Sequence, residues 1–241
     1  LAELCKEDKA VEKNLVFPKG VKPGINRDEY LNNEIALPFK NNQPDLEEQK
    51  RIADKIDKLF AEVESGENVA THIKKDSENL LFSELEQIFG NKDSSRKNYT
   101  FERLASIYDS KRKPINSTER LKIQGGFPYL GANGVVDHIN DFIFDGDYLL
   151  IAEDGGYFKK FEETAYLFSG KFWVNNHAHI VQAIPKMTTN KWLYYFFLYE
   201  DISQYCSGAT RLKLNQAKLR SIEVPLLTVN WKPDLMRQNE I

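Results

Sequence analysis

The sequence predicts an α+β protein: a globular domain of mixed or antiparallel β-strands with flanking helices, joined to a long helix of the coiled-coil type. Residues 46–90 contain no proline and place apolar residues at coiled-coil spacing. Residues 99–225 alternate short apolar runs with glycine-containing turns, as strands and their connections do. One block of sequence also recurs 189 residues later, which predicts two related structural units.

Composition excludes several classes of protein. The chain has 241 residues, a net charge of -3 and 41% hydrophobic residues, so it can build a folded core. No run of about 18 apolar residues is present, and the start of the chain lacks the apolar segment of a secretory signal. We therefore expect no membrane association. Cys5 and Cys206 lie far apart and form no paired spacing, which favours a reducing, cytoplasmic location.

The long helix is expected over residues 46–90. Asp45 precedes it as an N-cap, and Glu47 and Glu48 place acidic charge in the first turn. At 1.5 Å per residue this helix would be about 68 Å long, which is too long for an ordinary core helix. The expected packing positions follow the seam of a coiled coil: Ile52, Ile56, Leu59, Val63 and Ile73.

Along the chain we expect five segments. They are a C-terminal remnant of a preceding domain (1–45), the long helix (46–90), a linker (91–98), the globular domain (99–225), and a linker with the start of a second long helix (226–241). Within the globular domain the expected strands are Phe127–Leu130, Phe142–Phe144, Tyr148–Ala152 and His179–Ile184. The expected turns are Gly125-Gly126, Gly131–Gly134, Asp145-Gly146, Asp154–Gly156 and Ser169-Gly170. The run of aromatic and aliphatic side chains in residues 190–205 predicts a buried helix.

The internal repeat pairs several blocks in the same order. At an offset of 189 residues, the matched pairs are Asn26 and Asn215, Pro44 and Pro233, Gln49 and Gln238, and Ile52 and Ile241. Pro38 matches Pro225 at an offset of 187. Because Ile241 matches the second turn of the long helix, we expect this sequence to be part of a longer tandem protein, with domain tail, helix, whole domain and helix start.

Several of these blocks carry a family resemblance. Ile35-Ala-Leu-Pro38 followed by Leu46-Glu-Glu-Gln-Lys-Arg-Ile52, together with Phe127–Gly134, Gly146–Ile151 and Leu214-Asn215, resembles type I restriction–modification specificity subunits. Such proteins alternate two target recognition domains with two long helices, which pair antiparallel and bind methyltransferase subunits. The resemblance implies that residues 99–225 are a second target recognition domain and that 46–90 are the central spacer.

The resemblance also implies the partners. We expect double-stranded DNA, of which this domain would recognise half of a bipartite site. We further expect methyltransferase (modification) subunits and, through them, the restriction subunit. The apolar stripe of helix 46–90 could in addition bring about self-association.

Catalytic chemistry is not expected. The chain has no Pro-Pro sequence of the kind that holds a flipped base in amino-methyltransferases, and no phosphate-binding glycine loop. His177 and His179 alternate along a strand and could place both rings on one face, but no third ligand follows at a telling spacing. We therefore predict no catalytic residue, no cofactor and no metal.

The distribution of charge permits DNA binding. Residues 46–90 carry 6 Lys and Arg against 11 Asp and Glu, whereas residues 99–225 carry 15 against 14. The acidity therefore belongs to the helix, and loop clusters in the domain are basic enough to contact phosphates and bases. The candidate DNA-binding residues are Lys111, Arg112, Lys113, Arg120, Lys122, Asn133, Lys159, Lys160, Asn175, Asn176, Arg211 and Lys213.

Two alternatives remain open at this stage. The chain could be the C-terminal recognition module of a fused restriction enzyme–methyltransferase, since the same module could follow a methyltransferase domain. It could also be a scaffold that dimerises through residues 46–90 and does not bind DNA.

Overall fold

A computed structural model describes residues 36–90 and 95–240. The chain divides into two units, residues 1–72 and 73–241, which are described separately. Most of the expected remnant 1–45, part of the linker 91–98, Asn26 and Ile241 lie outside the described residues, as does Cys5.

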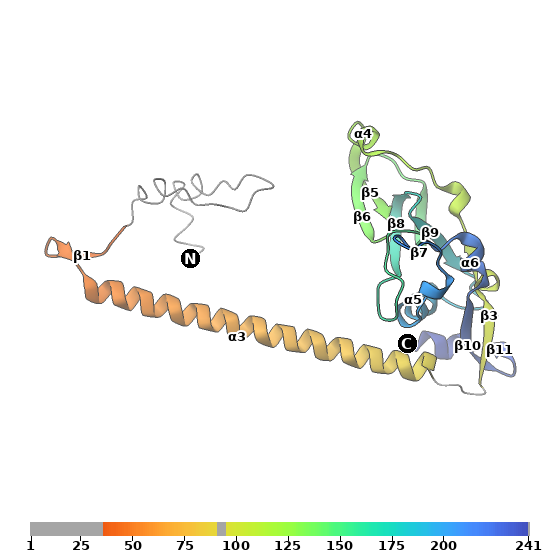
Figure 1. Cartoon of the computed structure of the whole chain (residues 1–241), viewed down its shortest axis with the longest axis horizontal. Helices are drawn as coiled ribbons and strands as arrows, with labels where there is room; N and C mark the ends of the chain where they lie inside the picture. The colour runs from red at the N-terminus through yellow and green to blue at the C-terminus, as the bar shows by residue number, and fades with distance from the viewer. Residues whose placement is uncertain (1–35, 91–94, 241) are drawn as a thin grey trace. The chain divides into compact units, whose positions relative to one another are not determined.

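The long helix is confirmed as α3 (Leu46–Leu85), followed by one π-helical turn, η2 (Glu86–Gly90). Figure 1 shows α3 as a single continuous helix. Its N-terminus is capped as expected, because the Asp45 carboxylate accepts a hydrogen bond from the backbone N–H of Glu48 at 3.1 Å. The seam residues Leu59 and Val63 are 48% and 59% exposed. No helix among the described residues is both long and apolar enough to cross a membrane.

The globular domain contains two sheets. The six-stranded sheet has the order β4-β9-β7-β8-β5-β6 and is antiparallel except for the parallel pair β5–β8. Its strands are β4 (Ala105–Ile107), β5 (Gln124–Gly131), β6 (Gly134–Ile139), β7 (Phe144–Ala152), β8 (Ala165–Val174) and β9 (Ala178–Ala183). The three-stranded sheet has the order β11-β10-β3, from β3 (Arg96–Thr100), β10 (Glu223–Val229) and β11 (Lys232–Pro233). The domain is therefore α+β, as predicted.

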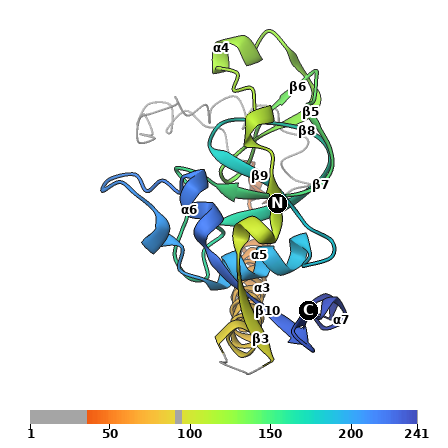
Figure 2. The same ribbon diagram turned by 90° about the vertical axis from the view of Figure 1, so that its right-hand side faces the viewer.

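Short helices complete the domain (Figure 2). They are α4 (Ser117–Arg120), α5 (Asn190–Tyr199), α6 (Gln216–Ser221) and α7 (Leu235–Asn239), with 3-10 turns η3 (Phe101–Arg103), η4 (Asp109–Lys111) and η5 (Ser203–Tyr205).

Both faces of the six-stranded sheet are buried. Along β7, Leu149 and Ile151 join the core that contains α5, whereas Leu150 joins a second cluster with Phe144 and Phe172. This explains the unbroken apolar run in β7, because successive side chains of a strand point to opposite faces.

The end of the long helix belongs to this core. Phe89 packs against Trp192 and Tyr199 of α5, with ring centroids 5.0 and 5.5 Å apart. Lys160 forms an ion pair with Glu86 at 2.6 Å. These contacts attach the last helical turns to the globular domain.

Three predicted turns prove wrong. Gly125-Gly126 lies inside β5, where the register with β6 shifts between Gln124 and Phe127. Asp145-Gly146 lies inside β7 and Ser169-Gly170 lies inside β8, where Gly146 and Gly170 are paired with each other. Both glycines have positive φ, 130° and 100°. They therefore accommodate an irregular backbone while the ladder continues, and the two strands are longer than their apolar runs suggest.

Three other boundaries also differ. Phe142 and Ile143 precede β7, which begins at Phe144. Asp154–Gly156 does not form a tight hairpin turn but opens the long connection 153–164 between β7 and β8. The helix expected over 190–205 ends at Tyr199, because Glu200 adopts an extended conformation with ψ 141°.

The repeat is visible in three dimensions as two matching hairpins. In one, β1 (Phe39–Lys40) pairs with β2 (Gln43–Pro44), and in the other, β10 pairs with β11. The two central residues of each turn have positive φ: Asn41 and Asn42 in the first, Asn230 and Trp231 in the second. Positive φ at both central positions is the geometry of a type I′ hairpin, so the two units use the same turn.

The same cap follows each hairpin. Asp234 accepts from the N–H of Arg237 as Asp45 does from that of Glu48. The backbone N–H of Asp45 donates to Pro38 O, and that of Asp234 donates to Leu227 O. The structure therefore equates Pro38 with Leu227 at the constant offset of 189, and the expected match with Pro225 is wrong for this segment.

Candidate nucleic-acid interface

Four connecting segments lie together at one edge of the six-stranded sheet. They are the β5–β6 turn, the start of the β7–β8 connection, the residues before β9, and the loop before α6. Asn133 Nδ2 donates to Gly155 O at 3.1 Å, which joins the first two segments. The backbone N–H of Glu153 donates to His177 O at 2.8 Å, and that of Leu214 donates to Glu153 O at 2.8 Å. Loops far apart in sequence thus form one surface.

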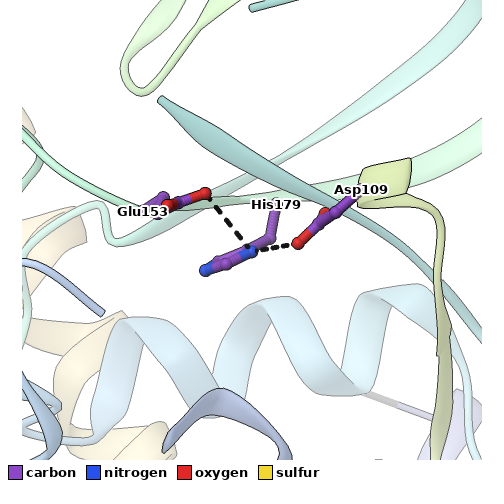
Figure 3. Close-up of side chains that lie close together, drawn as sticks. All are labelled: Asp109, Glu153 and His179. Carbon is purple, nitrogen blue, oxygen red and sulfur yellow. Dashed lines mark hydrogen bonds and ion pairs between the residues drawn. The ribbon is translucent and has the colours of Figure 1, made fainter. Parts of the chain in front are cut away.

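A buried ion-pair network lies beneath this surface. Figure 3 shows the His179 ring with Asp109 on one side and Glu153 on the other. His179 Nδ1 lies 2.6 Å from Asp109 Oδ2 and 3.9 Å from Glu153 Oε2. Arg112 Nη1 donates to Glu153 Oε2 at 2.7 Å, and Lys213 Nζ lies 3.0 Å from Glu153 Oε1. The network joins η4, β7, β9 and the loop before α6.

Both nitrogens of His179 face oxygen acceptors. Nε2 lies 2.8 Å from Leu214 O, which can only accept, so Nε2 carries a proton. Nδ1 faces the carboxylate of Asp109. The ring is therefore held between two oxygen acceptors, one on each nitrogen.

The carboxyl groups of this network ionise readily. Burial by itself raises the pKa of Asp109, but hydrogen bonding and charge from His179, the charge of Arg112 and the Ile180 N–H together lower that pKa below its ordinary value. Burial also raises the pKa of Glu153, and the hydrogen bonds from Arg112 and Lys213 outweigh this effect and lower it. Both groups are therefore anionic at neutral pH.

Asp109, Glu153 and His179 bring three potential metal-ligand atoms within 4.8 Å of one another. The side chains that would bind a metal already have partners within the protein. Arg112 and Lys213 neutralise the carboxylates, and Leu214 O accepts a hydrogen bond from His179 Nε2. A divalent cation would have to displace a buried guanidinium. The arrangement is that of an ion-pair network that supports loops.

Three of the predicted DNA-binding residues are engaged within the protein. The Arg112 side chain is 15% exposed and also donates to the carbonyl of Ala178 at 2.9 Å. Arg120 pairs with Asp137 at 2.8 Å and lies 4.8 Å from the centroid of the Tyr129 ring. Lys160 pairs with Glu86 and is the residue that holds the end of the long helix. The side chains of Arg112 and Arg120 are thereby shielded from solvent, whereas that of Lys160 is 39% exposed.

The other candidates present polar atoms at the surface. Lys111, Lys113, Lys122 and Lys159 are exposed, and Lys111 lies 5.0 Å from the centroid of the Tyr108 ring. Arg211 and Lys213 are 63% and 49% exposed and pair with Asp154 and Glu153. Asn133 occupies the exposed β5–β6 turn.

Asn175 and Asn176 line a surface hollow of about 390 Å³, together with Arg120 and His177. His177 Nδ1 lies 2.7 Å from Asp154 Oδ1, the atom that also receives Arg211. The hollow is therefore adjacent to the exposed pair Arg211–Asp154, and four of the predicted residues lie in this one area.

The acidic residues of the site were missed by reasoning from the sequence. Asp109, Glu153 and Asp154 hold five basic or histidine side chains between them, yet none was a candidate. These partners are 23 to 70 residues away, apart from Arg112 on Asp109. The available signal was weak: two acidic residues directly follow the apolar run of β7.

Comparisons with known proteins agree with this arrangement. The family profile "Type I restriction modification DNA specificity domain" matches residues 96–230. A Haemophilus influenzae protein described as a type I restriction enzyme specificity subunit is 35% identical over 139 residues, which cover 57% of this chain and 33% of that protein. The chain thus spans about one third of that relative's length.

One of the solved structures compared with this chain shares its fold. A chain from a structure on assembly and conformational transition of the type I R-M system has a TM-score of 0.54 and 18% identity, covering 82% of this chain and 50% of that one. The HsdS subunit of Thermoanaerobacter tengcongensis is 16% identical with a TM-score of 0.48, covering 95% and 56% of the two chains.

The first prediction separates the buried from the exposed arginine. Arg112→Ala leaves the carboxylates of Asp109 and Glu153 without their buried cation, so we expect it to lower the free energy of unfolding by about 3–5 kcal/mol. Arg211→Ala breaks an exposed pair and should cost less than about 1 kcal/mol. Urea unfolding at pH 7 measures both. Equal effects of the two substitutions would contradict the structural role of Arg112.

The second prediction concerns acid. Asp109 and Glu153 have lowered pKa values in the folded protein, relative to 3.8 and 4.5 for the unperturbed groups. The unfolded chain therefore binds more protons as the pH falls. The stability that these groups contribute is present above about pH 5 and is lost as the pH falls through the folded pKa values.

Urea unfolding between pH 7 and pH 3 checks this dependence. Asp109→Asn should flatten the acid limb, whereas Asp145→Asn, which changes an exposed carboxylate in β7, should leave it as in the wild type. An unchanged acid limb in Asp109→Asn would show that this carboxyl is not responsible.

Proposed function

The chain belongs to the family of type I restriction–modification DNA specificity domains, and from this membership we propose that the globular domain reads the base sequence of double-stranded DNA. The observation that carries the proposal is the family match over residues 96–230, which span the domain from β3 to β10. The matched domain is the specificity component of such systems and is not itself catalytic.

The chemistry of the loop edge supports this role. Asparagine amides such as those of Asn175 and Asn176 can both donate to and accept from base edges in the major groove. Exposed lysine and arginine side chains around them can contact phosphates, which position a protein without reading sequence. We therefore propose Asn133, Asn175 and Asn176 as base-contact candidates, and Lys111, Lys113, Lys122, Lys159, Arg211 and Lys213 as phosphate-contact candidates.

A bipartite site follows from the repeat. Gln238 is buried, accepts from Thr188 Oγ1 at 2.8 Å, and donates to Met187 O. Its counterpart Gln49 has a buried Nε2 for which the described residues offer no acceptor. We propose that residues 36–50 pack against a preceding domain of this kind. Residues 225–239 have the same role in the domain described here. Two such domains would read two half-sites.

The seam of α3 supplies a surface for partners. Its apolar residues are exposed along one side of a helix whose opposite side is charged. An exposed apolar stripe of this length is typical of a helix that packs against another. We propose that a second long helix of the same kind packs on this seam and that methyltransferase subunits, with the restriction subunit beyond them, assemble around the pair.

The third prediction tests sequence-specific binding. Selection from a pool of randomised duplexes, with and without a methyltransferase subunit, should enrich a motif of a few base pairs. Asn176→Ala should change the selected bases. Lys113→Ala should weaken binding to all sequences and lower the salt slope by about one.

Lys186→Ala is the matched control for Lys113→Ala, because Lys186 is equally exposed but lies outside the candidate set. It should bind like the wild type. Absence of any enriched motif at low salt, in both the presence and absence of the methyltransferase subunit, would refute the proposed function.

The fourth prediction tests the seam. In sedimentation velocity the chain alone should self-associate, because a second copy supplies a second long helix. Leu59→Lys with Val63→Lys should shift the population to monomer, since two buried charges in an apolar seam are costly. Ala61→Lys places one charge on the opposite side of the helix and should leave association intact. A wild-type chain that stays monomeric at all concentrations would argue against helix pairing here.

A further inference from the structure

Asp154 occupies an unusual position in the candidate interface. Asp154 follows β7, and its side chain is only 15% exposed. The side chains that contact its carboxylate nevertheless reach it from the surface. Oδ1 receives Arg211 Nη2 at 2.5 Å and lies 2.7 Å from His177 Nδ1. Lys213 Nζ lies 4.0 Å from Oδ2. One sheltered carboxylate thus faces three groups that could otherwise contact an anion.

Arg211 reaches this carboxylate across a glycine. Gly155 has φ +68°, and a Cβ built at this position would lie 2.7 Å from Arg211 Nη2. A side chain at residue 155 would therefore collide with the guanidinium. The positive φ and the missing side chain of Gly155 leave space in which the Arg211 guanidinium lies against the loop.

The Arg211–Asp154 pair is different from the neighbouring pair Lys213–Glu153. Glu153 belongs to the buried network and is also held by Arg112 at 2.7 Å, so Lys213 has a fixed anchor. Arg211 is 63% exposed, and an ion pair of that exposure contributes little to stability. A phosphate oxygen offers the same charge and could replace the carboxylate as the acceptor of Arg211.

We infer that Asp154 is an internal competitor of the DNA phosphate: it holds Arg211 in the free protein and releases it only where a duplex seats fully on the interface. This inference rests on the proposed function. Binding to non-target DNA derives almost entirely from phosphate contacts. In a non-target encounter Arg211 stays on Asp154 and adds no phosphate contact, so Arg211 contributes affinity only to the complex in which the duplex seats fully.

According to this inference, Arg211 contributes to the binding affinity of the enriched duplex only. The duplex enriched by selection and a scrambled duplex of equal length are the probes, and fluorescence anisotropy over a salt series is the measurement. Arg211→Ala should weaken binding to the enriched duplex and leave the scrambled duplex nearly unchanged, because Arg211 is already held by Asp154 in that encounter. Equal weakening of both would overturn the inference.

Asp154→Asn tests the same pair from the other side. Removing the carboxylate frees Arg211, so affinity for the scrambled duplex should rise about two- to fivefold, the range that corresponds to an exposed ion pair. The salt slope should steepen by about 0.9, the value for one further phosphate contact. Affinity for the enriched duplex should rise at least as much, because the pair no longer has to be broken, but its salt slope should stay unchanged, since Arg211 already contacts a phosphate there. Asp145→Asn alters net charge by the same amount in an exposed position of β7 and should have no such effect.

The double variant Asp154→Asn with Arg211→Ala distinguishes release of Arg211 from general repulsion of phosphate. If Asp154 acts through Arg211, the gain for the scrambled duplex disappears in the double variant. Persistence of that gain, or an equal gain in Asp145→Asn, would overturn the inference. Thermal unfolding of each variant verifies folding, and Arg211→Ala provides the test if Asp154→Asn does not fold.

Failure of the inference and failure of the proposed function give different results. If the wild-type chain prefers the enriched duplex and Arg211→Ala weakens binding to both duplexes equally, the proposed function stands. The inference about Asp154 then fails. A wild-type chain that binds no duplex in any condition contradicts the proposed function, and the inference falls with it.

Discussion

The loop edge of the domain depends on the buried ion-pair network of Asp109, Arg112, Glu153 and His179. Leu214 and Ala132 of these loops are buried in the apolar core, and charge-assisted hydrogen bonds of the network add directional contacts that help to determine the positions of the loops. Arg112 holds the residues before β9 through the carbonyl of Ala178, and Lys213 ties the loop before α6 to Glu153. Such a network is costly to bury and is stable only because each charge meets a partner. In return, it brings segments more than 100 residues apart into one rigid surface.

The same domain also holds one end of the long helix. The π-helical turn places Phe89 against α5, and Lys160 bridges to Glu86, so the last turns of the helix are part of the core. The remainder of α3 exposes its apolar seam. Under the proposed function both properties are used, because the helix would set the separation of two recognition domains and stay available to partner helices. The matching hairpins and caps before α3 and α7 show that both repeats enter their helices in the same way.

Much of the fold could be predicted because its signals are local. The cap at Asp45, the spacing of Ile52, Leu59 and Val63, and the tight turn at Gly131–Gly134 each depend on neighbouring residues. The predicted turns at Gly146 and Gly170 failed because a glycine has the same local signature in a turn and inside an irregular ladder. Only the pairing of β7 with β8 decides between these structures. The candidate DNA-binding residues stay a prediction, and the sequence does not separate Arg112 and Arg120, which pair with carboxylates inside the domain, from exposed loop cations.

By itself the sequence determined the class of the protein: the α+β domain, the long capped helix, the repeat at 189 residues and the resemblance to specificity subunits. These features follow from hydrophobic periodicity, turn residues and shared sequence motifs, all of which depend on neighbouring residues. The tertiary structure alone decided which charged side chains remain at the surface. Whether an arginine faces solvent or a buried carboxylate depends on residues dozens of positions away, as with Arg112 and Glu153 or Arg211 and Asp154. The free energy of a charge is set by burial and by its partners, and both exist only once the strands have assembled.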